Sequence, residues 1–318
     1  MSRGPGRPVN ATEPICSSEQ GFSVHGLRGP AAELRMVPEL GGRIISLRSR
    51  RTGREWCWHQ PRPDWLWANR PGDPFATGPQ AGVDECVPTV APCRARGRDL
   101  PDHGEVWCQA WTLDPLALAD RMLRAEVPLA VSPMVFGRAI QAGADGAFRF
   151  DYSLRNLGAE PEPFIWSLHP LLALEPGDRL ELPAEVRSLR LDGGIGAAIE
   201  RGDAWDYPEP FADVRLDQCQ VPGMPGGCVK GFAGPLAHGR AAVVNDRTGD
   251  RLEWNWDPAL VPFLGVWINR GHGGFHHLAL EPATGAPDSL ADAVGKWRQF
   301  ATIEPGATLR WTITLSIS

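Results

Sequence analysis

The feature that most constrains the fold of this chain is an alternation of apolar and polar residues with a period of two. The clearest example is C-terminal, where every second residue from Leu309 to Ile317 is apolar and the residues between are polar. Successive side chains of a β-strand point to opposite faces, so this pattern predicts a strand with one face on a core. Similar patterns cover residues 148–155 and 252–256, and a shorter one surrounds Ile45 and Leu47.

One segment alone predicts a helix. Asp288 or Ser289 can cap it, and Leu290, Val294 and Trp297 follow at helical spacing. The 36 glycines and 31 prolines are spread along the chain rather than gathered in a linker. This distribution favours many strands joined by turns, and therefore an all-β fold, a large sandwich or barrel.

The strand patterns continue without a domain boundary. We therefore expect residues 1–318 to form a single domain, with residues 1–20 as a poorly ordered N-terminal extension. The segment Pro61–Pro79 is rich in Pro and Trp and predicts a long loop, beyond which strand patterns resume.

The composition excludes several classes of function. A net charge of -6 gives no general electrostatic reason to bind nucleic acid or an anionic membrane. Neither a signal peptide nor a stretch of membrane-spanning length is recognisable, which predicts a cytoplasmic protein. Seven cysteines without a CxxC pair indicate neither a disulfide framework nor a zinc ribbon. The expected partner is a small molecule, and the 13 tryptophans offer flat apolar faces of the kind on which sugars pack.

Two residues stand out as chemical groups in apolar surroundings. His169 follows the apolar run 164–168 and precedes Pro170, a setting in which a lone histidine is more often structural than catalytic. Glu281 lies in the apolar stretch 278–282, where an unpaired carboxylate would be costly to bury. The sequence leaves open whether Glu281 forms an ion pair with an arginine or serves as a general base.

A third group of residues is dense in polar and aromatic side chains. The segment 100–107 contains Asp102, His103, Glu105 and Trp107 around Gly104. Asp102 and His103 can simply stabilise a turn, but a histidine beside an aromatic face also suits sugar binding.

Taken in order, these motifs resemble the galactose mutarotase-like superfamily, in particular its aldose 1-epimerases. The resemblance rests on four segments and runs from about Leu34 to the C-terminal strand: Gly41-Gly42-Arg43-Ile44, Asp102-His103-Gly104, His169-Pro170 and Ala279-Leu280-Glu281-Pro282. It implies a large antiparallel β-sandwich. It also implies an isomerase that interconverts the α and β anomers of a free sugar and needs no metal or organic cofactor.

The resemblance implies roles for individual residues. Glu281 is the base that takes the proton of the C1 hydroxyl, and His169, in its protonated form, is the acid that protonates the ring oxygen. His103 hydrogen-bonds near the ring oxygen, and Arg43 contacts the substrate. We add Trp107 as a stacking wall for the sugar.

The sequence departs from the family at residues 82–88, where acidic residues stand in place of an Asn-Arg pair that grips the sugar. Asp84 and Glu85 can accept hydrogen bonds from sugar hydroxyls, or they can form a turn paired with Arg94 or Arg96. No residue matches the family's aspartate that contacts sugar hydroxyls.

Three alternatives remain. The chain can be a non-catalytic sugar-binding or sugar-sensing module. It can be an epimerase of a sugar phosphate, for which arginines such as Arg43, Arg94, Arg96 and Arg98 should converge on the phosphate. His272, His276 and His277 also suggest metal ligands, although the sequence shows no clear partner set for them.

Overall fold

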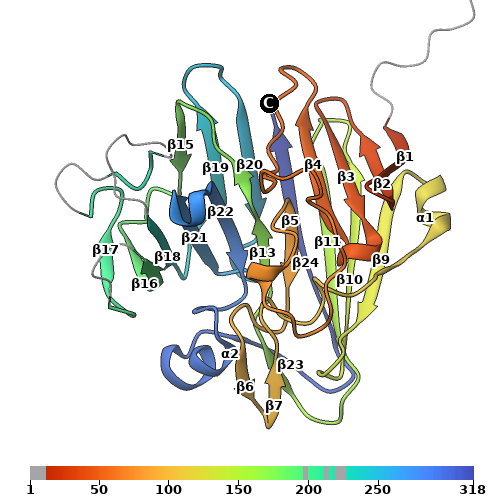
Figure 1. The fold of residues 1–318 in the computed structure, drawn as a ribbon. Coiled ribbons are helices and arrows are strands. Elements are labelled where there is room, and N and C mark those ends of the chain that lie inside the picture. Colours follow the sequence, from red (N-terminus) through yellow and green to blue (C-terminus); the bar gives the residue numbers. More distant parts are fainter. Residues whose placement is uncertain (1–11, 196–199, 211–214, 219–226) are drawn as a thin grey trace, which may run out of the picture.

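Two large antiparallel sheets form the body of the protein (Figure 1). The computed structural model describes residues 12–195, 200–210, 215–218 and 227–318. The twelve strands of the first sheet follow in spatial order, with β14 paired to β22 off the main path: β1 (Glu13–Glu19), β2 (Phe22–Arg28), β3 (Ala32–Val37), β4 (Arg43–Ser49), β5 (Val83–Cys86), β13 (Ser167–Pro170), β22 (His276–Ala283), β21 (Phe263–Arg270), β18 (Gly227–Ala233), β16 (Ser188–Ile195), β17 (Ala204–Asp206) and β14 (Leu172–Ala173).

The second sheet has eight strands and packs against the first across the hydrophobic core. Its strands follow in spatial order: β15 (Asp178–Glu181), β19 (Gly239–Asn245), β20 (Arg251–Trp256), β24 (Thr308–Ile317), β11 (Phe148–Asn156), β10 (Met134–Ala142), β9 (Met122–Pro128) and β8 (Thr112–Leu113).

Smaller elements complete the fold. Two short strand pairs and two helices have these bounds: β6 (Cys93–Ala95) with β7 (Arg98–Leu100), β12 (Glu162–Phe164) with β23 (Ala301–Ile303), α1 (Pro115–Ala119) and α2 (Leu290–Asp292). Single turns of 3₁₀-helix cover Pro38–Leu40, Phe75–Thr77 and His272–Gly274, and a π-helical turn, Ala293–Trp297, extends α2. Figure 1 shows α2 close to the β6–β7 hairpin and β23 at one end of the molecule.

The predicted all-β class is confirmed, and the strongest sequence patterns coincide with strands. The alternating segments form β24, β11, β20 and β4, and the one predicted helix is α2 with its π-helical extension. Ser289 is its N-cap, with the Asp292 amide donating to the Ser289 hydroxyl at 3.3 Å. None of the helices in the described residues has the length and apolar character needed to cross a membrane.

The N-terminal prediction was wrong in part. Residues 13–19, expected to lack order, form β1 and pair along their whole length with β2. Residues 1–11 lie outside the described part of the chain.

The first sheet has two chemically different faces. Along β21 and β22, alternate side chains such as Val266, Ile268 and Leu280 enter the core between the sheets. The side chains between them, including Trp267 and Glu281, point to the opposite face because successive residues of a strand alternate. That opposite face carries the candidate site.

A buried ion pair links the two sheets. Glu85 of β5 points into the core, where Arg138 of β10 donates to its Oε1 at 2.8 Å and Trp166 donates to its Oε2 at 2.8 Å. Both charged side chains are almost fully buried. The alternative in which Glu85 forms a turn paired with Arg94 or Arg96 was therefore wrong, because residues 83–86 form a central strand.

This pair generates a stability prediction. Arg138→Met removes the cation and leaves the Glu85 carboxylate buried without its counter-charge, so we expect a loss of about 3 kcal/mol in the free energy of unfolding. Urea denaturation measures this loss. The double variant Glu85→Gln, Arg138→Met should recover part of it, and equal stabilities of the single and double variants would contradict the account.

Candidate active site

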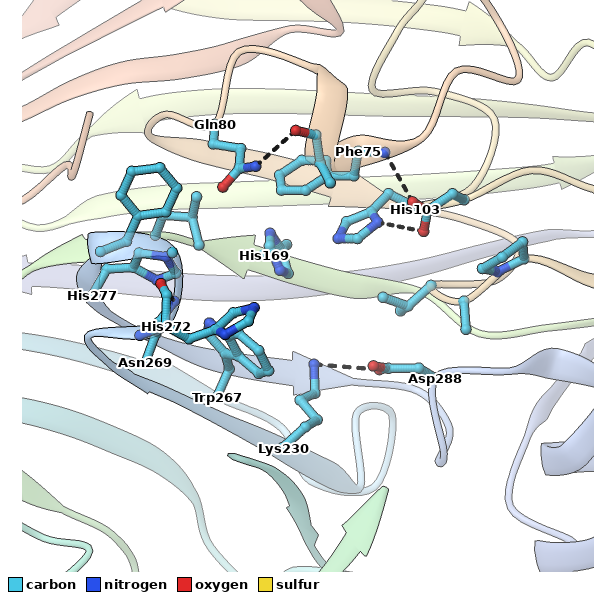
Figure 2. A pocket seen from close by; sticks show the side chains of 18 residues that line it. Phe75, Gln80, His103, His169, Lys230, Trp267, Asn269, His272, His277 and Asp288 are labelled. Carbon is cyan, nitrogen blue, oxygen red and sulfur yellow. Dashed lines mark hydrogen bonds and ion pairs between the residues drawn. The ribbon is translucent and has the colours of Figure 1, made fainter. Parts of the chain in front are cut away.

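A cavity of about 440 Å³ opens on the outer face of the first sheet. Its walls come from four consecutive strands of that sheet, β13, β22, β21 and β18, and from the loops that cover them. Its described lining includes Phe75, Gln80, Asp102, His103, His169, Leu171, Lys230, Trp267, Asn269, His272, Phe275, His277 and Asp288 (Figure 2). This is within the size range of small-molecule sites.

Strand register brings the central groups together. His169 of β13 lies opposite Asp84 of β5, and Glu281 of β22 lies opposite Gly265 of β21. On the next strand, Lys230 of β18 lies opposite Trp267. Residues far apart in the sequence therefore share one face of the sheet.

Glu281 lies beneath the cavity floor and is 0% exposed. Its Oε2 contacts the Lys230 ammonium group and lies 3.4 Å from the Ser167 hydroxyl. Its Oε1 lies 3.9 Å from Nε2 of His169 and has no hydrogen-bond partner among the described residues. One carboxylate oxygen is thus occupied by a cation, and the other lies unpaired beside His169, which lines the cavity.

Lys230 is the principal residue that the sequence analysis missed. Its ammonium group contacts Glu281 and lies 3.3 Å from Oδ1 of Asp288. Burial alone would lower the pKa of Lys230, but the charges of Asp288 and Glu281 raise it overall, so the side chain is a cation. A signal was present, since Lys230 is one of only two lysines in a chain with 32 basic residues and interrupts an otherwise apolar strand.

A glycine makes room for this ion pair. Lys230 and Glu281 lie on strands that flank β21, and Gly265 is the β21 residue between them. A Cβ atom at position 265 would lie 3.2 Å from Cβ of Glu281 and 3.3 Å from Cε of Lys230. The missing side chain lets Lys230 reach across the strand.

The surroundings of His169 disfavour the protonated, positively charged form that a general acid requires. Burial lowers the pKa of His169 well below 6.5, and the positive charges around it, led by His103 and Lys230, lower it further. The imidazole is therefore neutral near pH 7 in the site as it stands. The expectation that a nearby negative charge keeps His169 protonated is not supported by this environment.

His103 is held rigidly at the cavity wall. Its Nδ1 lies 2.9 Å from Oδ1 of Asp102, and its ring stacks on Phe75 with a centroid separation of 3.8 Å. Burial would raise the pKa of Asp102, but hydrogen bonds from His103 and from the Phe75 amide lower it overall. The contact with the ionised carboxylate and the stacking on Phe75 together fix the orientation of the ring.

The other predicted substrate contacts lie outside the cavity lining. Arg43 is buried and donates to Oδ1 of Asp84 at 2.8 Å. Burial raises the pKa of Asp84 to about 6, although Arg43 acts in the opposite direction. Glu85 points into the core, and Trp107 packs edge-on behind Phe75, with its indole donating to the Asp102 carbonyl at 2.9 Å. These side chains support the site rather than line it.

Aromatic groups and histidines form a second part of the wall. Trp58 contacts His277 and Phe275 at centroid distances of 4.6 and 5.1 Å, and Trp267 lies 6.4 Å from His277. The glycine-rich segment predicted as an alternative metal site supplies His272 and His277 to the cavity. Across the described ranges, no group of three or more His, Cys, Asp or Glu side chains is placed to hold a metal ion.

Buried, neutral His277 predicts a dependence of stability on pH. Burial lowers its pKa from 6.5 to about 4, so unfolding takes up a proton at any pH between these values. The contribution of neutral His277 to the free energy of unfolding is complete above pH 6.5 and is lost as the pH falls toward 4. Acidification from pH 7 to 5 should cost about 2 kcal/mol through His277.

Urea denaturation of wild type and His277→Gln at the two pH values tests this. The variant should lose about 2 kcal/mol less than wild type on acidification. The raised pKa of Asp288 makes the protein more stable on acidification, which is the opposite effect. This contribution is the same in wild type and variant, so it cancels in the comparison. Parallel pH curves for the two proteins would show that His277 is not buried in its neutral form.

Comparison with known proteins agrees with this architecture. No family model and no curated protein matches the sequence. Among solved structures, a protein of Synechocystis sp. PCC 6803 is 17% identical with a TM-score of 0.65, and the match covers 100% of this chain and 98% of that one. A galactose mutarotase related enzyme from Lactobacillus acidophilus is 14% identical with a TM-score of 0.66, covering 93% of this chain and 97% of that one.

A third similar structure is a galactose mutarotase-like protein from Clostridium acetobutylicum. It is 13% identical with a TM-score of 0.66, and the match covers 96% of this chain and 98% of that one. At such identities the likeness concerns the fold. The galactose mutarotase-like β-sandwich expected from the sequence is confirmed.

Proposed function

Starting from the galactose mutarotase-like fold, we propose that this protein is an aldose 1-epimerase-like isomerase of a free, unphosphorylated sugar. The observation that carries the proposal is the placement of Glu281. Its Oε1 has no hydrogen-bond partner within the described residues, and it lies 3.9 Å from Nε2 of His169 at the floor of a sugar-sized cavity.

The chemistry needs a base and a proton donor on one small ring. Glu281 takes the proton of the C1 hydroxyl, the bond between C1 and the ring oxygen breaks, and the ring oxygen receives a proton. The open-chain aldehyde turns about its bond to C2, and closure gives the other anomer. A correctly placed proton-transfer group is worth about 10²–10⁴-fold in rate.

Several lining groups suit a neutral sugar. Phe75 and Trp267 offer apolar ring faces, and His103, Gln80 and Asn269 offer hydrogen-bonding groups for hydroxyls. Arg43 and Asp84 support the loop and strand around this wall from behind, through their buried ion pair.

The phosphate alternative receives no support from the arginines. Of the described residues, no arginine lines the cavity. Arg94 forms an ion pair with Asp99, and Arg96 and Arg98 both form ion pairs with Glu162. A phosphate dianion would therefore meet Lys230 alone, and that cation already contacts two carboxylates.

A sugar-binding module is the second candidate, and one observation favours it. The neutral state of His169 removes the imidazolium that the family mechanism uses as its acid. A protein with this cavity and without a proton donor would bind a sugar and leave its anomers unchanged.

Glu281→Gln separates the two candidates. The amide keeps the size of the side chain and removes the base, so the catalysed rate of anomer exchange should fall at least about 10²-fold, with a much smaller change in sugar affinity. Polarimetry or NMR of freshly dissolved anomers, screened over neutral hexoses and pentoses, measures the rate, and calorimetry measures binding.

Glu304→Gln is the matched control, because Glu304 is exposed. It should keep the wild-type rate. Tight sugar binding by a wild-type protein that never exceeds the buffer rate would establish the binding module instead, and a Glu281→Gln variant with the wild-type rate would remove Glu281 from its role.

A further inference from the structure

We infer that Lys230 is the general acid of the site, and that Lys230 and Glu281 act as one acid–base pair in which the ammonium group protonates the ring oxygen while the carboxylate deprotonates the C1 hydroxyl. The inference rests on the proposed function. His169 is then a neutral hydrogen-bonding partner of the sugar.

The position of Lys230 meets the geometric requirement. An ammonium group has three N–H donors, of which one is donated to Glu281, while Asp288 Oδ1 lies 3.3 Å away as an ion-pair partner. Lys230 also lines the cavity, and Figure 2 shows its side chain extending from the strand toward the side on which His169 lies. At least one N–H is therefore left for a sugar oxygen.

The choice of lysine at this position is informative. Arginine is the cation used almost everywhere else in the chain, including both of the buried pairs with Asp84 and Glu85. An arginine cannot give up a proton in a protein, whereas an ammonium group can. If Lys230 only neutralised the charge of Glu281, it would not need a proton that it can give up, and an arginine would serve equally well.

The proton balance closes within the pair. Glu281 gains the proton of the C1 hydroxyl at Oε1, the electron pair of the bond between C1 and the ring oxygen goes to the ring oxygen, and Lys230 gives that oxygen a proton. The two side chains change from an ion pair to a neutral acid and amine. Ring closure runs these transfers in reverse: neutral Lys230 takes the proton back from the former ring oxygen and Glu281 returns its proton to the oxygen on C1, so the ion pair is restored and no external acid or base is needed.

The acidity of Lys230 rises when it is needed. Its pKa is raised by the charges of Asp288 and Glu281, against burial, which lowers it. Protonation of Glu281 removes one of the two charges and leaves the desolvation in place. Proton uptake by the carboxylate therefore makes the neighbouring ammonium group a better donor in the same step.

The central experiment uses both lysines of the chain. Lys230→Met should lower kcat for anomer exchange at least about 10²-fold. Lys296→Met is the matched control, because the Lys296 side chain is 72% exposed and forms a surface ion pair with Asp292, and it should keep the wild-type rate. Lys230→Arg keeps the charge without a transferable proton and should remain as impaired as Lys230→Met. His169→Asn should lose less than about tenfold.

Two readouts separate an acid from a structural counter-charge. Ethylammonium added to Lys230→Ala should restore part of the lost kcat, with the gain proportional to its concentration. The kcat of wild type should stay level from pH 7 to 9, whereas an imidazolium acid at His169 would lose about tenfold per pH unit over this range.

The outcomes distinguish the two proposals. Wild-type protein without catalysed exchange overturns the function and this inference together. Normal exchange by Lys230→Met, full activity of Lys230→Arg, or a wild-type rate that falls from pH 7 overturns the inference and leaves the proposed function standing.

Discussion

Charges buried within the first sheet must be compensated, and this constraint organises the structure around the site. Asp84 and Glu85 lie on β5 and Glu281 lies on β22, with β13 between these two strands, and all three are fully buried. An isolated carboxylate in such a place would be protonated or would destabilise the fold. Each therefore has a cation within contact, from Arg43, Arg138 and Lys230 in turn.

The three pairs have different consequences because they lie on different faces of the sheet. Arg138 and Glu85 meet between the sheets, where no ligand reaches them, and they connect one sheet to the other. Lys230 and Glu281 meet on the outer face, where Lys230 lines the cavity and Glu281 lies buried beneath it. Alternation along a strand makes this division, since Asp84 and Glu85 are adjacent in the sequence and point to opposite faces.

The cavity combines a charged floor with neutral walls. His169 and His277 are both held neutral by burial, and the His103 ring is fixed by Asp102 on one side and Phe75 on the other. Neutral imidazoles and aromatic faces suit an uncharged polyol, and the floor supplies the groups that can move protons. In the proposed mechanism, proton transfer takes place at one point, where Lys230, Glu281 and His169 meet.

Much of this protein was determined by local sequence alone. The period-two pattern of segments such as Leu309–Ile317 predicted strands, and Ser289 with its apolar followers predicted the one helix, because these features depend on neighbours in the chain. His169, His103 and Glu281 were also recognisable, since each lies in a short distinctive motif. The partners of Asp84 and Glu85 were not predictable, because Arg43 and Arg138 lie 41 and 53 residues away from them in the sequence. The same holds for Lys230, which lies 51 residues from Glu281 and meets it only because Gly265, on the strand between them, has no side chain. The sequence by itself determined the all-β class and drew attention to His103, His169 and Glu281. Only the tertiary structure decided which charges meet and that His169 is neutral, because both depend on burial and on long-range register.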